Sequence, residues 1–166
     1  MSIRPFYDRW PQYNRRLTEI VRAMSDEQLA IRPAPNLWPI WATVGHDAGV
    51  RVYWLCTILG EPGAEATPFD PQADEGWEDD LDHPRGAADL VLALDSTWAI
   101  IDRCLDLWTP AMLDETVERF YGEERQVHSR ASILQRLLTH DAYHCGELSQ
   151  TLGINGLPQI DLWRPD

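Results

Sequence analysis

Hydrophobic residues recur at three- and four-residue steps along the first part of the chain, which is the spacing of a helix that buries one face. The segment from Ile3 to Met24 follows this pattern. It contains Pro11, which we expect to kink the helix or to mark a short first turn, because proline lacks a backbone donor. The segment from about Ile40 to Leu59 contains no proline and is apolar on nearly all sides, as expected of a buried helix.

Two further helices are predicted in the second half of the chain. One spans roughly Ala87 to Leu107, and the other begins at Ser129 and has Gly153 as its C-terminal stop. Between Leu113 and His128 the pattern changes to alternation around Gly122, which predicts a short hairpin. We therefore expect an all-α protein, a four-helix bundle with a short hairpin before the last helix.

A segment rich in proline, glycine and acidic residues separates the second and third predicted helices, from Glu61 to Arg85. It is too long for an ordinary connection, and loops of this length are uncommon unless they are functional or disordered. We expect a partly ordered flap that Trp77 anchors to the helices. A disordered acidic insertion is the alternative.

Composition narrows the class of protein. With 166 residues the chain has the size of one compact domain, so we expect residues 1–166 to form a single domain. The formal net charge of −13 should repel nucleic acids and anionic membrane surfaces. No apolar run approaches the roughly 20 residues that span a bilayer, and the N-terminal residues lack the apolar core of a signal peptide, so we expect a cytoplasmic protein. The three cysteines are widely spaced and indicate neither a disulfide framework nor a thiolate zinc site.

Three histidines are candidate metal ligands. His140 and His144 are four residues apart in the last predicted helix, which places both rings on one face, about 6 Å apart along the axis. This spacing lets two imidazoles bind one ion, although ordinary hydrogen-bonded histidines explain the pair alone equally well. His46, in the first half of the second predicted helix, can supply a third ligand, because Ala42 and Gly49 leave room for a ligand or a neighbouring helix.

The other histidines and the neighbouring aspartates have simpler interpretations. We expect His83, in the acidic loop, and His128, before the last helix, to be solvated. Asp47 and Asp141 each adjoin a candidate ligand in sequence. A solvated helix face is the expected environment of both, and a role in orienting an imidazole N–H is the alternative.

Tyr53 and Glu147 are the candidates for assisting proton transfer. Tyr53 is on the side of its helix that carries His46, where its hydroxyl can reach a bound molecule. Glu147 faces near the two histidines and is a candidate for acid–base catalysis or for a fourth ligand, with a solvent-facing glutamate as the alternative. Cys145 projects away from the histidine pair, so we do not expect a reactive thiol.

Three segments together resemble the DinB/YfiT-like superfamily of metalloenzymes: WATVGHDAGVRVYW, LLTHDAYHCGELSQTLG and the closing GLPQIDLW. The resemblance covers nearly the whole chain. Its most specific part is HDAYHCGELS, where the family has two histidines four apart and a glycine two residues on, matched here by His140, His144 and Gly146. Carried over by position, the family's three-histidine site falls on His46, His140 and His144. Cys145 and Glu147 depart from the residues that are frequent in the family.

The resemblance implies an up-down-down-up bundle, often a homodimer, that binds zinc, nickel or another divalent ion. Characterised relatives include thiol-dependent enzymes, among them mycothiol-dependent maleylpyruvate isomerase and bacillithiol S-transferases. The first hypothesis is therefore a metal-dependent transferase or isomerase that activates a low-molecular-weight thiol toward a small electrophilic substrate. A metal-dependent hydrolase is the second hypothesis. The third is a non-catalytic, stress-related module that binds a metal or ligand.

Overall fold

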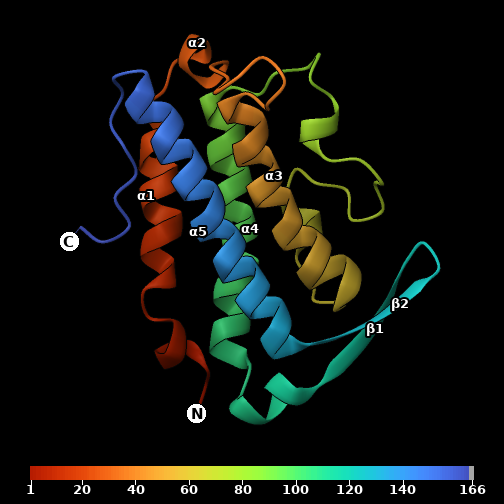
Figure 1. Ribbon diagram of the computed structural model, residues 1–166. Helices are drawn as coiled ribbons and strands as arrows, with labels where there is room; N and C mark the ends of the chain where they lie inside the picture. Colours follow the sequence, from red (N-terminus) through yellow and green to blue (C-terminus); the bar gives the residue numbers. More distant parts are fainter. Residues whose placement is uncertain (165–166) are drawn as a thin grey trace.

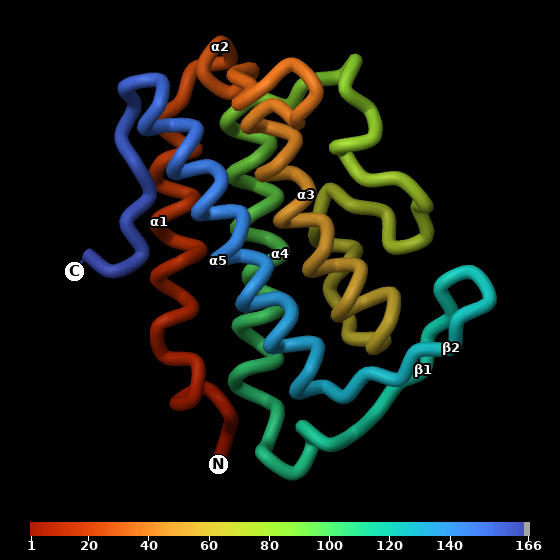
Figure 2. The backbone as a smooth tube through the Cα atoms, viewed as in Figure 1, coloured from red at the N-terminus to blue at the C-terminus, as the bar shows by residue number. Residues whose placement is uncertain are grey.

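The computed structural model describes residues 1–164, and the chain is mostly helical. Among the described residues four long helices lie side by side (Figure 1). Helix α3 packs against α4 and α5, and α1 packs against the same two helices. The backbone tube in Figure 2 shows the same arrangement of the helices. These long helices are α1 (Trp10–Arg22), α3 (Ile40–Val52), α4 (Ala87–Leu107) and α5 (Arg130–Ile154).

The predicted N-terminal helix is divided into two parts near Pro11, which marks a first turn as one of the two expectations stated. A 3-10 turn, η1 (Arg4–Tyr7), precedes α1, and Pro11 lies in the first turn of α1, where its missing N–H has no helical partner to lose. A short helix, α2 (Asp26–Leu29), follows α1. The side chain of Ser25 caps α2 by accepting from Gln28 N.

The second predicted helix is continuous but changes its geometry. Helix α3 continues directly into the π-helical segment η2 (Tyr53–Ile58), so the helical path ends one residue before Leu59. Two 3-10 turns, η3 (Ala64–Ala66) and η4 (Trp77–Asp79), interrupt the acidic loop that follows. Trp77 packs against the hydrophobic core and against Phe69, with ring centroids 4.7 Å apart, which confirms the predicted anchor.

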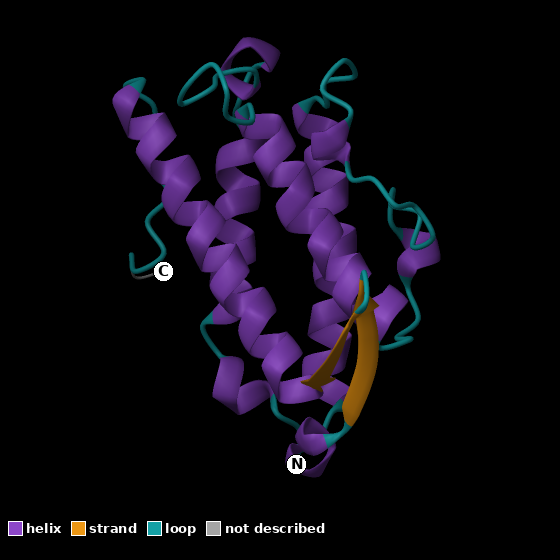
Figure 3. Cartoon of the chain, turned by 45° about the vertical axis from the view of Figure 1, so that its right-hand side comes forward, coloured by secondary structure: helices purple, strands orange, loops and turns teal. Residues whose placement is uncertain are grey.

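The predicted hairpin and last helix are confirmed, with a correction at the C-terminus. After α4 a 3-10 turn, η5 (Pro110–Asp114), leads into β1 (Thr116–Tyr121) and β2 (Glu124–Ser129), which pair antiparallel (Figure 3). Ser129 caps α5 by accepting from Ser132 N at 3.1 Å. Gly153 is not the stop, because α5 continues through it to Ile154. Gly156, with a φ of +69°, reverses the chain two residues later.

The core consists of two hydrophobic clusters with a layer of buried polar residues between them. Each of the four long helices contributes residues to both clusters. On each of them a buried polar residue lies between the two groups, and on α3 this residue is Arg51. We call these residues the polar layer: Asn14, Asp47, Arg51, Thr97 and Asp141. The first cluster includes Leu17, Val44, Ala48, Leu94 and Cys145, and the second includes Trp10, Val52, Ile100 and Leu137.

Among the described residues, no helix has the length and apolar composition needed to cross a membrane.

Candidate metal centre

The three predicted histidines meet between α3 and α5. His46 Nε2 is 3.1 Å from His140 Nε2, and His144 Nε2 is 3.2 Å from the same atom. The side chains of His46 and His140 are each 21% exposed, whereas that of His144 is 8% exposed. The cluster is therefore open to solvent on the side of His46 and His140 and closed on the side of His144.

Each of these histidines contacts a carboxylate through its other ring nitrogen. His46 Nδ1 bonds to Glu78 of η4, and His140 Nδ1 bonds to Asp47 Oδ1 at 3.1 Å. His144 Nδ1 bonds to Glu147 Oε2 at 2.8 Å. A carboxylate accepts, so each neutral ring carries its proton on Nδ1 and directs the lone pair of Nε2 at the other two rings.

This donor set fits a divalent ion. Three converging lone pairs repel one another unless a cation lies between them. Bonds from imidazole nitrogens to a metal ion are about 2.0 to 2.1 Å long. If the nitrogen–metal–nitrogen angle lies between the octahedral and the tetrahedral value, two such nitrogens are roughly 2.8 to 3.4 Å apart. The two nitrogen–nitrogen distances of 3.1 and 3.2 Å lie within that range. His46, His140 and His144 thus form a group that could hold a metal ion.

Two glycines explain how the acidic loop reaches His46. A Cβ on Gly45 would come within 3.1 Å of the Trp77 ring, and one on Gly49 within 3.3 Å of the Phe69 ring. The space that small residues leave on this side of α3 is therefore filled by aromatic rings of the loop. Because Trp77 lies on Gly45, the next residue in the loop, Glu78, is brought to the ring of His46.

Behind His140 the polar layer continues into the core. Arg51 Nη2 lies 3.5 Å from Asp47 Oδ2 and 3.2 Å from Asp141 Oδ2, and Arg51 Nη1 donates to Asn14 Oδ1 at 2.7 Å. Trp10 Nε1 donates to Asp141 Oδ2 at 2.6 Å. The side chains of Asp47, Arg51 and Asp141 are at most 2% exposed. One guanidinium thus joins the carboxylate that orients His140 to a carboxylate held by α1.

The charges of the layer shift the pKa values of its members. Burial alone would raise the pKa of Asp47, but the hydrogen bond with His140 and the charge of Arg51 hold that pKa below its ordinary value. Burial raises the pKa of Asp141 to about 7, against the charge of Arg51. Burial works against the charge of Arg51, but Asp141 and Asp47 raise its pKa. Arg51 therefore stays charged and neutralises part of the layer.

The expectation of a solvated helix face is wrong for Asp47 and Asp141. Both are buried, because Arg51 lies one turn from Asp47 on the same helix and supplies the opposite charge inside the core. Asp47 takes the alternative role of orienting an imidazole, whereas Asp141 contacts Arg51 and Trp10.

The two remaining histidines lie outside the three-histidine group. His83 has a side chain that is 72% exposed and bonds to Asp80, as expected of a solvated residue. His128 is partly buried, with its ring centroid 4.9 Å from that of Trp54, and it lines a surface cavity, so the expectation of a solvated ring holds only in part.

The two proton-transfer candidates are placed differently. Glu147 bonds to His144 and also to the phenol of Tyr143, whose pKa it raises. Tyr53 accepts a hydrogen bond from Arg119 Nη1 at 3.1 Å. It lines a cavity of about 200 Å³ on the side of the acidic loop, and Glu78 is part of the same lining.

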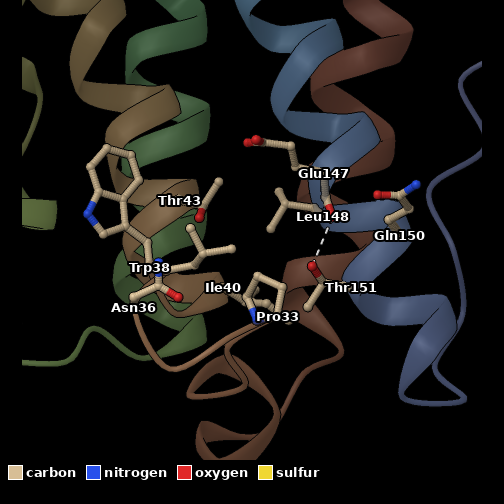
Figure 4. A pocket seen from close by; sticks show the side chains of 10 residues that line it. Pro33, Asn36, Trp38, Ile40, Thr43, Glu147, Leu148, Gln150 and Thr151 are labelled. Carbon is tan, nitrogen blue, oxygen red and sulfur yellow. Dashed lines mark hydrogen bonds between the residues drawn. The ribbon is translucent and has the colours of Figure 1, made fainter.

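A larger cavity, of about 430 Å³, is lined by residues of α3, of α5 and of the segment that precedes α3 (Figure 4). Two of its lining residues connect this cavity to the three histidines. The ring centroid of Trp38 is 5.0 Å from that of His46, and Glu147 bonds to His144. The floor carries the apolar side chains of Ile40 and Leu148. Other lining residues are Asn36, Thr43, Gln150 and Thr151.

Sequence reasoning missed Glu78 and Arg51. Glu78 is one of many acidic residues in its loop, and nothing in the local spacing distinguishes it. Arg51 did have a signal: a charged pair, Asp47 and Arg51, four residues apart in a helix that is apolar on nearly all sides.

The fold and site define a helical protein with a candidate His/Asp metal-binding cluster between two of its long helices. The sequence pattern of the DinB superfamily matches residues 12–148, and the chain belongs to this superfamily. Solved structures support the fold. A DinB-like protein from Bacillus cereus shares 19% sequence identity and a TM-score of 0.65, with 96% of each chain covered. A DinB-like protein from Bacillus subtilis shares 14% identity and a TM-score of 0.60, with 90% of each chain covered. A search of curated proteins gave no match.

Proposed function

We propose that the protein binds one divalent metal ion through His46, His140 and His144, and that it is a metal-dependent thiol transferase or isomerase acting on a small electrophile. The observation that carries the proposal is the convergence of three Nε2 atoms, each on a ring whose Nδ1 contacts a carboxylate. The proposal includes an up-down-down-up bundle for the four long helices. Zinc and nickel both suit imidazole ligands.

The chemistry follows from a site with three protein ligands. An ion held there would keep open positions and would stabilise the deprotonated form of a thiol or of water. His46 and His140 have the more exposed rings, so we expect a second molecule to approach from their side. The buried ring of His144 closes the opposite side.

We propose Glu147 as a group that moves a proton. Its carboxylate already contacts His144 and forms part of the wall of the 430 Å³ cavity. A carboxylate in this position can accept the proton of an incoming thiol and can return it to the product. We propose Tyr53 as a second group that assists proton transfer, since its side chain lines the 200 Å³ cavity and its hydroxyl accepts from Arg119.

The cavity favours a small electrophile with an apolar part. Trp38, Ile40 and Leu148 offer apolar surface, and amide and hydroxyl groups supply hydrogen bonds. We propose that the electrophile binds here, beside His46. The acidic loop carries Glu78 at the other side of that ring and would act as the flap.

The proposal is tested first by metal content. After reconstitution with zinc or nickel, we expect about one ion per chain, and a loss of affinity of at least 100-fold in His46→Ala, His140→Ala and His144→Ala. His83→Ala and His128→Ala are matched controls that should bind like the wild type. Equal metal content in wild type and His46→Ala would falsify the site.

The second arm separates the possible reactions. The zinc-loaded protein is assayed with a generic electrophile, with and without a low-molecular-weight thiol, and with an activated ester. Saturable thiol-dependent turnover that is lost in His140→Ala supports the transferase. Ester turnover without thiol indicates a hydrolase instead, and inactivity in both assays of a metal-loaded protein indicates a binding module.

A further inference from the structure

The hairpin and the start of α5 bring together three basic side chains that the candidate metal centre does not use. Arg119 belongs to β1, His128 to β2 and Arg136 to α5. All three lie against the ring of Trp54. The guanidinium carbons of Arg119 and Arg136 are 4.9 and 4.8 Å from its centroid, and the His128 ring is 4.9 Å away. Contact with one buried aromatic ring restricts where these groups can point.

The two arginines of this group differ from Arg125 and Arg130 in their partners. Elsewhere in the same region, Arg125 pairs with Glu118, and Arg130 pairs with both Glu61 and Glu115. Within residues 1–164 no carboxylate forms an ion pair with Arg119 or Arg136. This is unexpected in a chain with 27 acidic and 14 basic residues.

The partners and the pKa values of this group point to a positively charged site. Arg119 donates through Nη1 to Tyr53, and among the described residues its buried Nε has no acceptor. The pKa of His128 lies below its ordinary value, because burial and the charges of Arg136 and Arg119 disfavour the imidazolium form. An anion bound beside these groups would offset the charges of the two arginines.

A surface cavity of about 300 Å³ opens beside His128 and Arg136, which both line it. All of its lining side chains offer hydrogen-bond donors and none is a carboxylate: His128, Ser132, Gln135, Arg136 and Thr139. Arg136 is four residues before His140 on α5, which is about 6 Å along the axis. Figure 3 shows the hairpin that carries Arg119 and His128, and Figure 1 shows α5 continuing from it.

We propose that Arg119, His128 and Arg136 form a binding site for a small oxyanion, such as the carboxylate or phosphate group of a small molecule. Guanidinium groups bind such oxyanions through paired, charge-assisted hydrogen bonds. The remainder of that molecule extends along α5 past Thr139 toward the histidines, a part of the inference that rests on the proposed function. The ligand of this protein is therefore anionic at one end, despite the strongly negative charge of the chain.

The test is calorimetric titration of the full-length, metal-free protein with inorganic phosphate at low ionic strength. We expect saturable binding that is at least tenfold weaker in Arg119→Gln and Arg136→Gln. Gln135→Glu adds a negative charge to the exposed lining with little change in shape, so it should weaken binding as strongly without affecting the fold. Arg125→Gln, on the same hairpin but already paired with Glu118, should bind phosphate like the wild type.

Several outcomes would overturn the inference. One is the absence of saturable binding by wild type. Another is equal binding by wild type, Arg136→Gln and Gln135→Glu, which would mean that the arginines only cover Trp54. A third is loss of phosphate binding in His140→Ala, which would place the anion on the histidines. Zinc content measured on the same variants keeps the two proposals separate, because Arg136→Gln should retain zinc and His140→Ala should retain phosphate.

Discussion

The two hydrophobic clusters and the polar layer between them occupy the same four long helices but are built from different chemistry. The clusters bury aliphatic and aromatic side chains, whose removal from water stabilises the fold in proportion to their area. The polar layer buries two carboxylates and one guanidinium, whose desolvation offsets much of their mutual attraction. The layer touches the candidate metal centre through the bond from His140 to Asp47. The clusters therefore stabilise the fold, whereas the layer also orients the site.

The largest expected effect is on the polar layer itself. Arg51→Met keeps most of the side-chain volume but leaves Asp47 and Asp141 buried without their counter-charge. We expect the free energy of unfolding of the metal-free protein to fall by about 3 to 5 kcal/mol. Urea denaturation measures this change.

Leu94→Ala is the matched control in the first cluster, because Leu94 is also fully buried. The substitution should lower the free energy of unfolding by about 2 to 5 kcal/mol through the cavity that it leaves. Metal affinity, measured under conditions in which the variant is fully folded, should be unchanged. If Arg51→Met proved nearly neutral, the layer would not depend on its internal charge balance.

A smaller loss of stability is expected at the edge of the layer on α1. Trp10→Phe removes the indole N–H that donates to Asp141 Oδ2 at 2.6 Å but keeps an aromatic ring in the second cluster. We expect a loss of about 1.5 to 3 kcal/mol in the free energy of unfolding, as for hydrogen bonds to charged groups. The same change at Trp98, which contacts the Trp10 ring edge-on, removes no bond to Asp141 and should cost less.

The third prediction concerns orientation of the ligand set. Asp47→Asn retains the shape of the side chain but weakens the bond that fixes the His140 ring. We expect zinc affinity to fall by about 10- to 100-fold, with one ion still bound at saturation. Competition with a chromogenic chelator gives the affinity. An unchanged affinity would show that packing alone orients His140, and that the layer has no influence on the site.

Much of the fold and the three candidate ligands could be predicted from the sequence. The periodicity of apolar residues located the four long helices, and alternation around Gly122 located the hairpin. The spacing of His140 and His144 placed both rings on one face of α5, because helical geometry is local. His46 was a candidate from its small neighbours and from the family resemblance, but neither helix alone encodes the distance between them, so only the structure shows that His46 meets the pair.

Only the tertiary structure decided the environments of the charged residues. Asp47 and Asp141 each precede polar or small neighbours that are also compatible with a solvated face, and their burial depends on Arg51 reaching both from α3. Glu78 contacts His46 because Trp77 packs against Gly45, a contact between residues 32 positions apart. Desolvation and Coulomb energy depend on all the groups within a few ångströms, so they are fixed only when separate elements come together. The sequence by itself therefore determined the helices and the residue types of the site, and the packing of those helices decided which charges are buried, paired or left open for a ligand.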